Sequence, residues 1–357
     1  MKVKVGDITK IKTGKLDANA SSTDGKYPFF TCSKEPLKID TYSYDCECVL
    51  VAGNGDLNVK YYNGKFDAYQ RTYIIEDNSN GLLYVPYLYY FLEGYIEELR
   101  KQSIGGVIKY IKLDNLTDAL IELPSVEEQK YIVNLMNTSS ELIDLRRETI
   151  NKLDSLVKAR FVEMFGNIKE NRFIKCKMRE VAHIKHGYAY SGEYFSDKDN
   201  GVVLVTPGNF ALGGGFQEIK NKYFTSKYPE EYVLHPGDLI VTMTDLSKKA
   251  DTLGYGAIIP DNTSKIYLHN QRIGLFDELD KRLNPVFVRW FMQTDEYRLE
   301  IVRTSTGSTV HHTSPDRILD SLIFLPPIQL QNDFVKFANQ VNKSKVILPK
   351  PPFNVII

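Results

Sequence analysis

The sequence predicts an α/β protein with two duplicated domains separated by a long, coiled-coil-forming helix. Three observations lead to this fold class. Residues 125–166 carry an unbroken helical pattern, the residues before it combine strand and helix patterns, and the residues after it repeat them in the same order. We expect a first domain at 1–124, a central spacer helix at 125–166, a second domain at 167–327, and a truncated distal helix with its tail at 328–357.

Composition narrows the class of protein. The 357 residues suffice for two or three domains, and the 43% hydrophobic fraction excludes a disordered chain. Basic and acidic residues number 45 each, so a nucleic-acid partner requires local clusters of basic side chains. No secretory signal follows Met1 and no run of roughly eighteen apolar residues occurs, so we expect a cytoplasmic chain with no membrane partner.

The four cysteines are too few and too scattered for a disulfide framework. Cys46 and Cys48 would share one face of a strand, but two further ligands for zinc are not evident nearby. We therefore expect no metal and no cofactor.

Short strand and turn patterns fill the first domain, followed by one helix. The expected elements are a turn and strand at 5–14, strands at 27–31, 48–52 and 68–75, a hairpin at 60–66 on an Asn-Gly turn, a helix at 86–101, a loop and strand at 103–109, and a closing segment at 121–124.

The central helix has a clear start and stop. Pro124 precedes it, Ser125 and Glu128 have the spacing of a capping box, and Gly166 follows its last apolar residues. A helix of this length would extend roughly 60 Å. Its apolar stripe requires a second helix to cover it, which favours a spacer between two domains over a helix lying on one domain.

The motifs of the first domain recur after the central helix. Residues 178–187 match 5–14, residues 236–242 repeat the buried strand, 285–300 repeat the helix, and Leu325–Gln331 repeats Leu123–Gln129. The offsets agree: 271 − 70 is 201 for the Gln-Arg pair, and both 305 − 103 and 326 − 124 are 202. Near the domain starts, 187 − 14 is only 173, so the two halves differ there by an insertion. Agreement in order and spacing predicts an internal duplication.

Signatures of catalysis are missing. There is no phosphate-binding Gly-x-x-x-x-Gly-Lys-Ser/Thr loop and no Gly-x-Ser-x-Gly elbow. Lys350–Phe353 has Lys where an amino-methyltransferase needs a polar acceptor, and Pro260-Asp261 lacks the downstream acid of a metal-dependent nuclease. His311 and His312 are adjacent on an expected strand and would point to opposite faces, which disfavours a shared metal ion.

The repeated polar motifs suit contacts with DNA. Arg and Gln can bond to guanine and adenine edges, and Gln70-Arg71 in the first half corresponds to Gln271-Arg272 in the second. Taken singly, such a pair is more often an ordinary surface dipeptide; its recurrence makes base contact equally plausible. Glycine and hydroxyl loops expose backbone amides that can bind phosphate oxygens. The candidate phosphate-binding residues are Ser103, Gly105, Gly106, Lys109, Ser305, Thr306, Gly307, Ser308, His311 and His312.

The arrangement resembles the specificity subunit of type I restriction–modification systems. The resemblance covers nearly the whole chain and is carried by the doubled half-domains, the two Leu-Pro helix starts, the loop Thr304–Val310 and the helix end Leu153–Phe161. It implies two target-recognition domains, each reading one half of a gapped DNA site. It also implies methyltransferase subunits docked on the helices, joined by restriction subunits, and no catalysis by the specificity subunit itself.

The resemblance also implies a partner-binding surface on the central helix. We assign to it the apolar residues Leu142, Leu145, Ile150, Leu153, Leu156 and Val157. The family has a second long helix after the second Leu-Pro start, whereas here the helical pattern from Gln329 breaks at residues 348–352. We therefore expect the chain to be truncated or rearranged, with self-association through the exposed stripe as a possible consequence. Two alternatives stay open: a silent cassette acting as a folded scaffold, and an enzyme fused to recognition.

Overall fold

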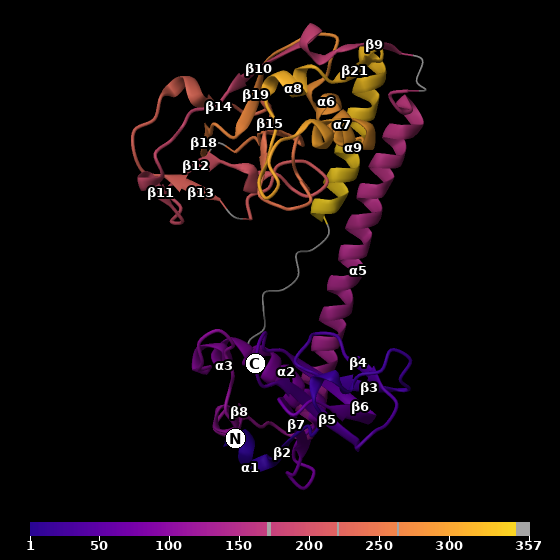
Figure 1. Ribbon diagram of the computed structural model, residues 1–357, viewed down its shortest axis with the longest axis vertical. Helices are drawn as coiled ribbons and strands as arrows, with labels where there is room; N and C mark the ends of the chain where they lie inside the picture. Colours follow the sequence, from indigo (N-terminus) through magenta and orange to yellow (C-terminus); the bar gives the residue numbers. More distant parts are fainter. Residues whose placement is uncertain (170–172, 220, 263, 348–357) are drawn as a thin grey trace. The chain divides into compact units, whose positions relative to one another are not determined.

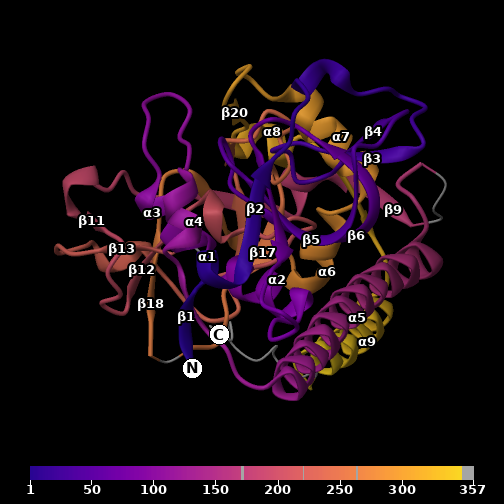
Figure 2. The ribbon, with the colours of Figure 1, turned by 90° about the horizontal axis from the view of Figure 1, so that it is seen from below.

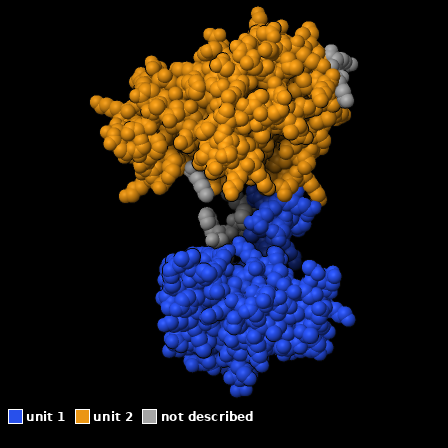
Figure 3. Space-filling model, viewed as in Figure 1, with its two compact units in different colours: residues 1–148, 349–357 blue, residues 149–348 orange. Residues whose placement is uncertain are grey.

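The computed structural model describes residues 1–169, 173–219, 221–262 and 264–347. Within them the chain divides into two compact units, which Figure 3 colours separately: unit 1 comprises Met1–Glu148, and unit 2 begins at Thr149. The expected helix break at 348–352 and the segment Lys350–Phe353 lie outside the described residues. Among the helices of the described ranges, none is long and apolar enough to cross a membrane.

Unit 1 is built on a six-stranded sheet with strand order β2-β7-β5-β6-β3-β4 (Figure 1). Its strands are β1 (Lys2–Lys4), β2 (Thr9–Thr13), β3 (Tyr27–Phe30), β4 (Leu37–Ile39), β5 (Tyr44–Ala52), β6 (Val59–Ala68), β7 (Thr72–Asp77) and β8 (Leu120–Glu122). Its helices are α1 (Val5–Ile8), α2 (Val85–Gly94), α3 (Ile96–Gln102), α4 (Leu113–Thr117) and the start of α5 (Val126–Phe165).

Three local predictions for unit 1 are wrong. The expected hairpin at Asn63-Gly64 does not form, because β6 pairs with β5 from Val59 to Phe66 and Phe66 is fully buried. The expected strand 68–75 is interrupted by a turn between β6 and β7, and the expected helix 86–101 is two helices that meet at Tyr95. The buried strand around Cys48–Ala52 is confirmed as the end of β5.

The long central helix is confirmed as α5, which contains 40 residues. Its predicted capping box is present: the Ser125 amide donates to Glu128 Oε2 at 2.9 Å, and the Glu128 amide donates to Ser125 Oγ at 3.3 Å. These bonds satisfy backbone donors that the first helical turn leaves without a partner.

Unit 2 contains the second set of elements, in two main sheets of order β10-β19-β15-β17 and β11-β13-β12-β18-β14. Its strands are β9 (Ile174–Lys177), β10 (Ala182–His186), β11 (Phe195–Ser196), β12 (Val202–Val205), β13 (Lys222–Phe224), β14 (Val233–Leu234), β15 (Leu239–Thr242), β16 (Thr244–Asp245), β17 (Gly256–Ile258), β18 (Ile266–His269), β19 (Ile273–Leu279), β20 (His311–His312) and β21 (Leu322–Leu325). Its helices are the end of α5, α6 (Pro285–Phe291), α7 (Asp295–Thr304), α8 (Pro315–Leu319) and α9 (Ile328–Ile347). The expected helix 285–300 is thus α6 and part of α7.

The end of α5 belongs to the core of unit 2, where α9 lies beside it (Figures 1 and 2). Phe161 and Phe165 on α5 pack against Phe334 on α9, with ring centroids 5.2 and 5.7 Å apart, and Phe165 lies 5.0 Å from Phe287 on α6. Burying these rings is the main source of stability for this contact. The predicted need for a covering helix is therefore met by α9 along this part of α5.

A buried glutamine fixes the start of the last helix in each unit, which is α5 in unit 1 and α9 in unit 2. Gln129, fully buried, donates to the carbonyls of Leu82 and Pro124 and accepts from the Tyr84 amide, at 2.8 to 3.0 Å. Gln331, also fully buried, makes the same three bonds, each at 2.8 Å, with Arg282, Pro326 and Asn284. The duplication predicted from sequence thus extends to identical hydrogen-bond networks.

Replacing Gln331 with Met tests the strength of this network. Met keeps the length of the side chain but leaves one amide and two carbonyls without partners, so we expect a loss of about 2–4 kcal/mol in the free energy of unfolding. Urea denaturation measures the change. Gln329→Met, on the exposed face of the same helix, is the control and should change stability by less than about 0.5 kcal/mol. Equal effects of the two substitutions would contradict the assignment.

Candidate nucleic-acid interface

The two Gln-Arg pairs form tight turns rather than strands. Gln70-Arg71 connects β6 to β7, Gln271-Arg272 connects β18 to β19, and all four residues are exposed. A glycine on the adjacent backbone segment allows it to approach each turn closely. A Cβ on Gly14 would lie 2.2 Å from the Ala68 carbonyl oxygen, and a Cβ on Gly187 would lie 2.1 Å from the Asn270 carbonyl oxygen. The turns therefore present long polar side chains from a rigid support.

The two predicted glycine loops have the same structure, and each is closed by a pair of backbone hydrogen bonds. In unit 1, Ile104 and Tyr110 exchange two backbone hydrogen bonds of 3.0 and 2.9 Å, and in unit 2, Thr306 and His312 do the same at 2.9 and 2.8 Å. In Figure 2 the first loop projects beyond α3. The loops occupy equivalent positions, because 306 − 104 and 312 − 110 are both 202.

Each loop depends on one glycine with a positive φ. Gly105 has φ +113° and Gly307 has φ +92°, and a Cβ at these positions would lie 2.6 Å from the Ile108 carbonyl and 2.0 Å from the Val310 carbonyl. Only glycine fits such a backbone without strain.

The loop serines have a structural role that sequence reasoning missed. Ser103 Oγ donates to the Arg100 carbonyl at 2.6 Å, and Ser305 Oγ donates to the Val302 carbonyl at 2.7 Å. Both hydroxyls thus close the end of a helix. The donors that the loops offer to a ligand are backbone amides: within the described ranges, none of the amides of Gly105, Gly106, Gly307 and Ser308 donates to a protein acceptor.

A short segment in each unit brings the turn and the loop together. In unit 1, the Gly53 amide donates to the Arg71 carbonyl at 2.7 Å, and the Gly53 carbonyl accepts from Ile111 at 2.9 Å. In unit 2, Met243 makes the same two bonds, with the Arg272 carbonyl and the Thr313 amide, each at 2.9 Å. Sequence reasoning did not identify Met243 as the equivalent of Gly53.

The basic and imidazole side chains lie beside these loops. Lys109 is exposed, and its equivalent by the same offset of 202 is His311. His312 Nδ1 lies 3.1 Å from Thr244 Oγ1 across the β16–β20 pair. Both ring nitrogens of His311 are buried without a hydrogen-bond partner. Among the described residues, no group of three or more His, Cys, Asp and Glu side chains is arranged to hold a metal ion.

Asp245 anchors the segment next to these histidines. Burial acts to raise its pKa, but hydrogen bonds from Ser247 and Thr252 more than compensate, so the pKa is lowered overall. The Ser247 amide donates to Oδ1 at 2.6 Å and the Thr252 hydroxyl donates to Oδ2 at 2.7 Å. The carboxylate is thus held in its charged form by the loop that it organises.

In unit 1, the turn and the loop border a hollow of about 450 Å³. Its walls include Tyr69 beside the turn, Asn54 and Gly55 from the connecting segment, and Ile108 from the loop. The loop tips differ between the units: Val107 is fully exposed and Ile108 is 62% exposed, whereas the equivalent residues in unit 2 are Thr309 and Val310. The two surfaces share a framework but differ in side-chain chemistry.

The residues assigned to partner binding on α5 fall into two groups. Leu142, Leu145 and Leu156 are 62%, 59% and 49% exposed, and Ile150 is partly exposed. Val157 is fully buried and Leu153 packs on the same core cluster of unit 2, so both serve internal packing and their assignment to a partner surface is corrected. The helical pattern alone does not distinguish inward-facing from outward-facing positions near a domain.

The amino-acid sequence is similar to proteins of known type. Residues 1–155 match the family described as type I restriction modification DNA specificity domain. Over 156 residues the chain is 38% identical to the type I restriction enzyme EcoDI specificity subunit of Escherichia coli, a match covering 44% of this chain and 34% of that protein. The chain thus spans about a third of the length of this relative.

Two further comparisons extend over most of the chain. The type I restriction enzyme MjaVIII specificity subunit of Methanocaldococcus jannaschii is 22% identical over 92% of this chain and 83% of its own length. The crystal structure of the type I restriction–modification system S subunit from M. genitalium aligns with 98% of this chain and 90% of its own, with a TM-score of 0.60 and 13% identity. Because the sequence identity to this structure is only 13%, the structural similarity shows a shared fold and no more.

Substituting the loop glycines tests the backbone assignment. Gly105→Ala places a Cβ against the Ile108 carbonyl, so we expect a cost of about 1–3 kcal/mol and faster amide hydrogen exchange at Ile104 and Tyr110. Gly106→Ala is the matched control, because a Cβ there meets no atom within 4 Å. Unchanged exchange in Gly105→Ala would show that the loop does not need this conformation.

Proposed function

We propose that this chain is a specificity subunit of a type I restriction–modification system and reads a bipartite, gapped DNA site. In this proposal each unit contacts one half-site, and methyltransferase and restriction subunits act on the DNA that the chain selects. The chain supplies recognition and is not itself catalytic.

The observation that carries the proposal is the repetition of one polar framework on two separate units. Each unit has a Gln-Arg turn and a glycine loop hydrogen-bonded to the same connecting segment. Internal stability does not require exposed Gln and Arg side chains at two equivalent turns. Reading two half-sites with one kind of scaffold does require such a repeat.

Each framework has the parts needed for both classes of DNA contact. Exposed Gln and Arg side chains can bond bidentately to adenine and guanine edges in the major groove. The amides of Gly105, Gly106, Gly307 and Ser308 can donate to phosphate oxygens, with Lys109 adding charge in unit 1. Because the chain has no net charge, these local donors must supply the attraction that an overall positive charge would otherwise provide.

The two units are expected to prefer different sequences. An apolar tip of Val107 and Ile108 suits contact with thymine methyl groups or a base step, whereas Thr309 in unit 2 offers a hydroxyl. A site with unlike halves follows from this difference.

The exposed part of α5 is proposed as the docking surface for the methyltransferase subunits. Leu142 and Leu145 on this stretch are more than half exposed, a large apolar contribution for a helix surface. Restriction subunits would then join through the assembled complex.

Single substitutions in the two turns should alter different half-sites. The complex of this chain with its methyltransferase subunits would be used to select duplexes from a randomised library, and the selected sequences would be read out. We expect Arg71→Ala to relax the preference at one position of one half-site and Arg272→Ala to relax it at one position of the other. The expected loss of discrimination is about 5- to 150-fold at each position, from the loss of one bidentate base contact.

Lys10→Ala and Lys281→Ala are the controls for this selection. Lys10 pairs with Glu76 near the far end of β7 from the unit 1 turn, and Lys281 follows the far end of β19 from the unit 2 turn. Both controls should select the parental site. If both arginine variants altered the same half-site, or neither altered any position, the assignment of one half-site to each unit would be wrong.

A further inference from the structure

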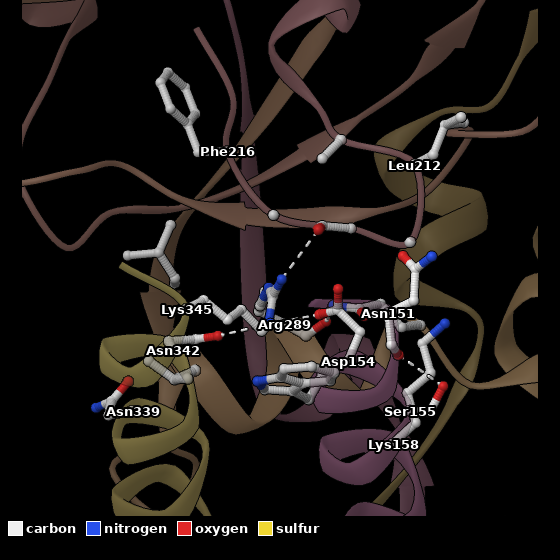
Figure 4. A pocket seen from close by; sticks show the side chains of 18 residues that line it. Asn151, Asp154, Ser155, Lys158, Leu212, Phe216, Arg289, Asn339, Asn342 and Lys345 are labelled. Carbon is white, nitrogen blue, oxygen red and sulfur yellow. Dashed lines mark hydrogen bonds and ion pairs between the residues drawn. The ribbon is translucent and has the colours of Figure 1, made fainter. Parts of the chain in front are cut away.

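A polar pocket in unit 2 lies apart from the turns and loops described above. It has a volume of about 760 Å³, is open to solvent on one side, and is bordered by α5, α6, α9 and the glycine loop Gly213–Gly215 (Figure 4). None of the residues that we assign to DNA contact lines it. Its size falls within the range of small-molecule sites, about 300–1,000 Å³.

The charged side chains of the pocket do not balance. Lys158, Arg289 and Lys345 carry positive charge, and Asp154 is the one acidic residue in its lining. Asp154 already pairs with Lys345, with 2.5 Å between Oδ1 and Nζ. Within the described ranges neither Lys158 nor Arg289 forms an ion pair, and Asp154 acts on the charge of Arg289 without a direct contact. The lining therefore carries two more positive than negative charges.

Arg289 is the more buried of these two cations. Its guanidinium donates a hydrogen bond of 3.0 Å from Nη2 to the Gly214 carbonyl and one of 3.3 Å from Nε to the side-chain oxygen of Gln293, and it lies 4.4 Å from the centre of the Trp290 ring. Burial lowers the pKa of Arg289 to about 10. A charge withdrawn from water without a partner of opposite sign destabilises the protein unless a ligand supplies that charge.

The glycine loop is shaped around this guanidinium. A Cβ on Gly215 would lie 2.6 Å from Arg289 Nη2, so any other residue would push the side chain away. In Figure 4, Arg289 reaches across the cavity toward this loop, while Asp154 and Lys158 face the cavity from α5. The guanidinium is therefore positioned by the backbone rather than free to turn outward.

Neutral donors complete the lining. Asn151, Asn339 and Asn342 place side-chain amides around the cavity, whereas the amide of Gln293 is bonded to Gly213 and Arg289. Two excess positive charges together with amide donors match a dianion that has many acceptor oxygens. A phosphate monoester carries about −1.5 to −2 charge at neutral pH and three acceptor oxygens, whereas a carboxylate or a phosphodiester carries one negative charge.

We propose that this pocket binds a phosphate monoester of about nucleotide size, with Arg289 and Lys158 contacting the phosphate. The remaining volume would hold the rest of the molecule between α6, α9 and the glycine loop. The site is separate from DNA reading and does not depend on the proposed function.

The test is isothermal titration calorimetry on the full chain, with adenosine monophosphate as the probe. We expect saturable binding of this monoester, with binding at least about tenfold weaker for cyclic adenosine monophosphate, a diester, and for adenosine. Lowering the pH from 7.5 to 5 should weaken binding of the monoester, because its second charge is lost near pH 6. Inorganic phosphate should compete with it.

Variants distinguish this site from general attraction to positive charge. Arg289→Gln and Lys158→Ala should each weaken binding by about tenfold or more. Lys343→Ala, which removes an exposed cation on α9 outside the pocket, should leave it unchanged. If Arg289→Gln fails to fold, Lys158→Ala decides, because its side chain is exposed and its loss leaves the core intact.

Three results would overturn the proposal. The first is no binding of adenosine monophosphate or inorganic phosphate at millimolar concentration, and the second is equal binding of monoester, diester and nucleoside. The third is displacement of the monoester by duplex DNA in a Lys158-dependent manner, which would make the pocket part of the DNA path. Because DNA selection is measured separately, these results leave the recognition proposal unaffected.

Discussion

The buried glutamine at the start of the last helix in each unit is the interaction on which the arrangement of each unit depends. One neutral side chain satisfies two carbonyls and one amide that would otherwise be buried without partners. In unit 1 these bonds join the segment before α2 to the start of α5, and in unit 2 the equivalent bonds join the segment before α6 to the start of α9. The direction in which each helix leaves its sheet is therefore fixed by polar bonds as well as by packing. In the proposed function the helices act as spacers, and a spacer needs a defined direction, which these two side chains help to set.

Repetition with divergence would let one chain address two different half-sites, as the proposed function requires. The backbone of the turn, the connecting segment and the glycine loop is preserved between the units, down to the same hydrogen bonds at Gly53 and Met243. The side chains on this framework differ: exposed Lys109 corresponds to partly buried His311, and the apolar loop tip of unit 1 corresponds to Thr309 and Val310. Backbone glycines such as Gly105 and Gly307 cannot change without strain, whereas exposed tips can change at little cost in stability. The framework is thereby kept, while the side chains that we propose to contact DNA remain free to vary.

The sequence predicted what depends on local pattern and missed what depends on distant contacts. The capping box and forty-residue length of α5, the duplication and the offset of the loops could all be inferred, because periodicity and order carry them. The sequence predicted Gln70-Arg71 within a strand at 68–75, whereas the pair forms a turn, because the close approach that Gly14 permits is not visible in the sequence. Val157 belonged to the apolar stripe of α5, yet the fold buries it against unit 2. The three cations of the pocket, Lys158, Arg289 and Lys345, lie on three helices that are far apart in the sequence, so no sequence spacing could have predicted that they meet.

One measurement tests most directly whether this chain directs modification to a two-part DNA site. The methylated bases of a host genome would be mapped with and without the chain, in cells that supply the cognate methyltransferase subunits. We expect a single gapped motif with two unlike halves to be methylated only when the chain is present. An identical methylation map in both cells would contradict the account and favour a chain that folds without directing modification.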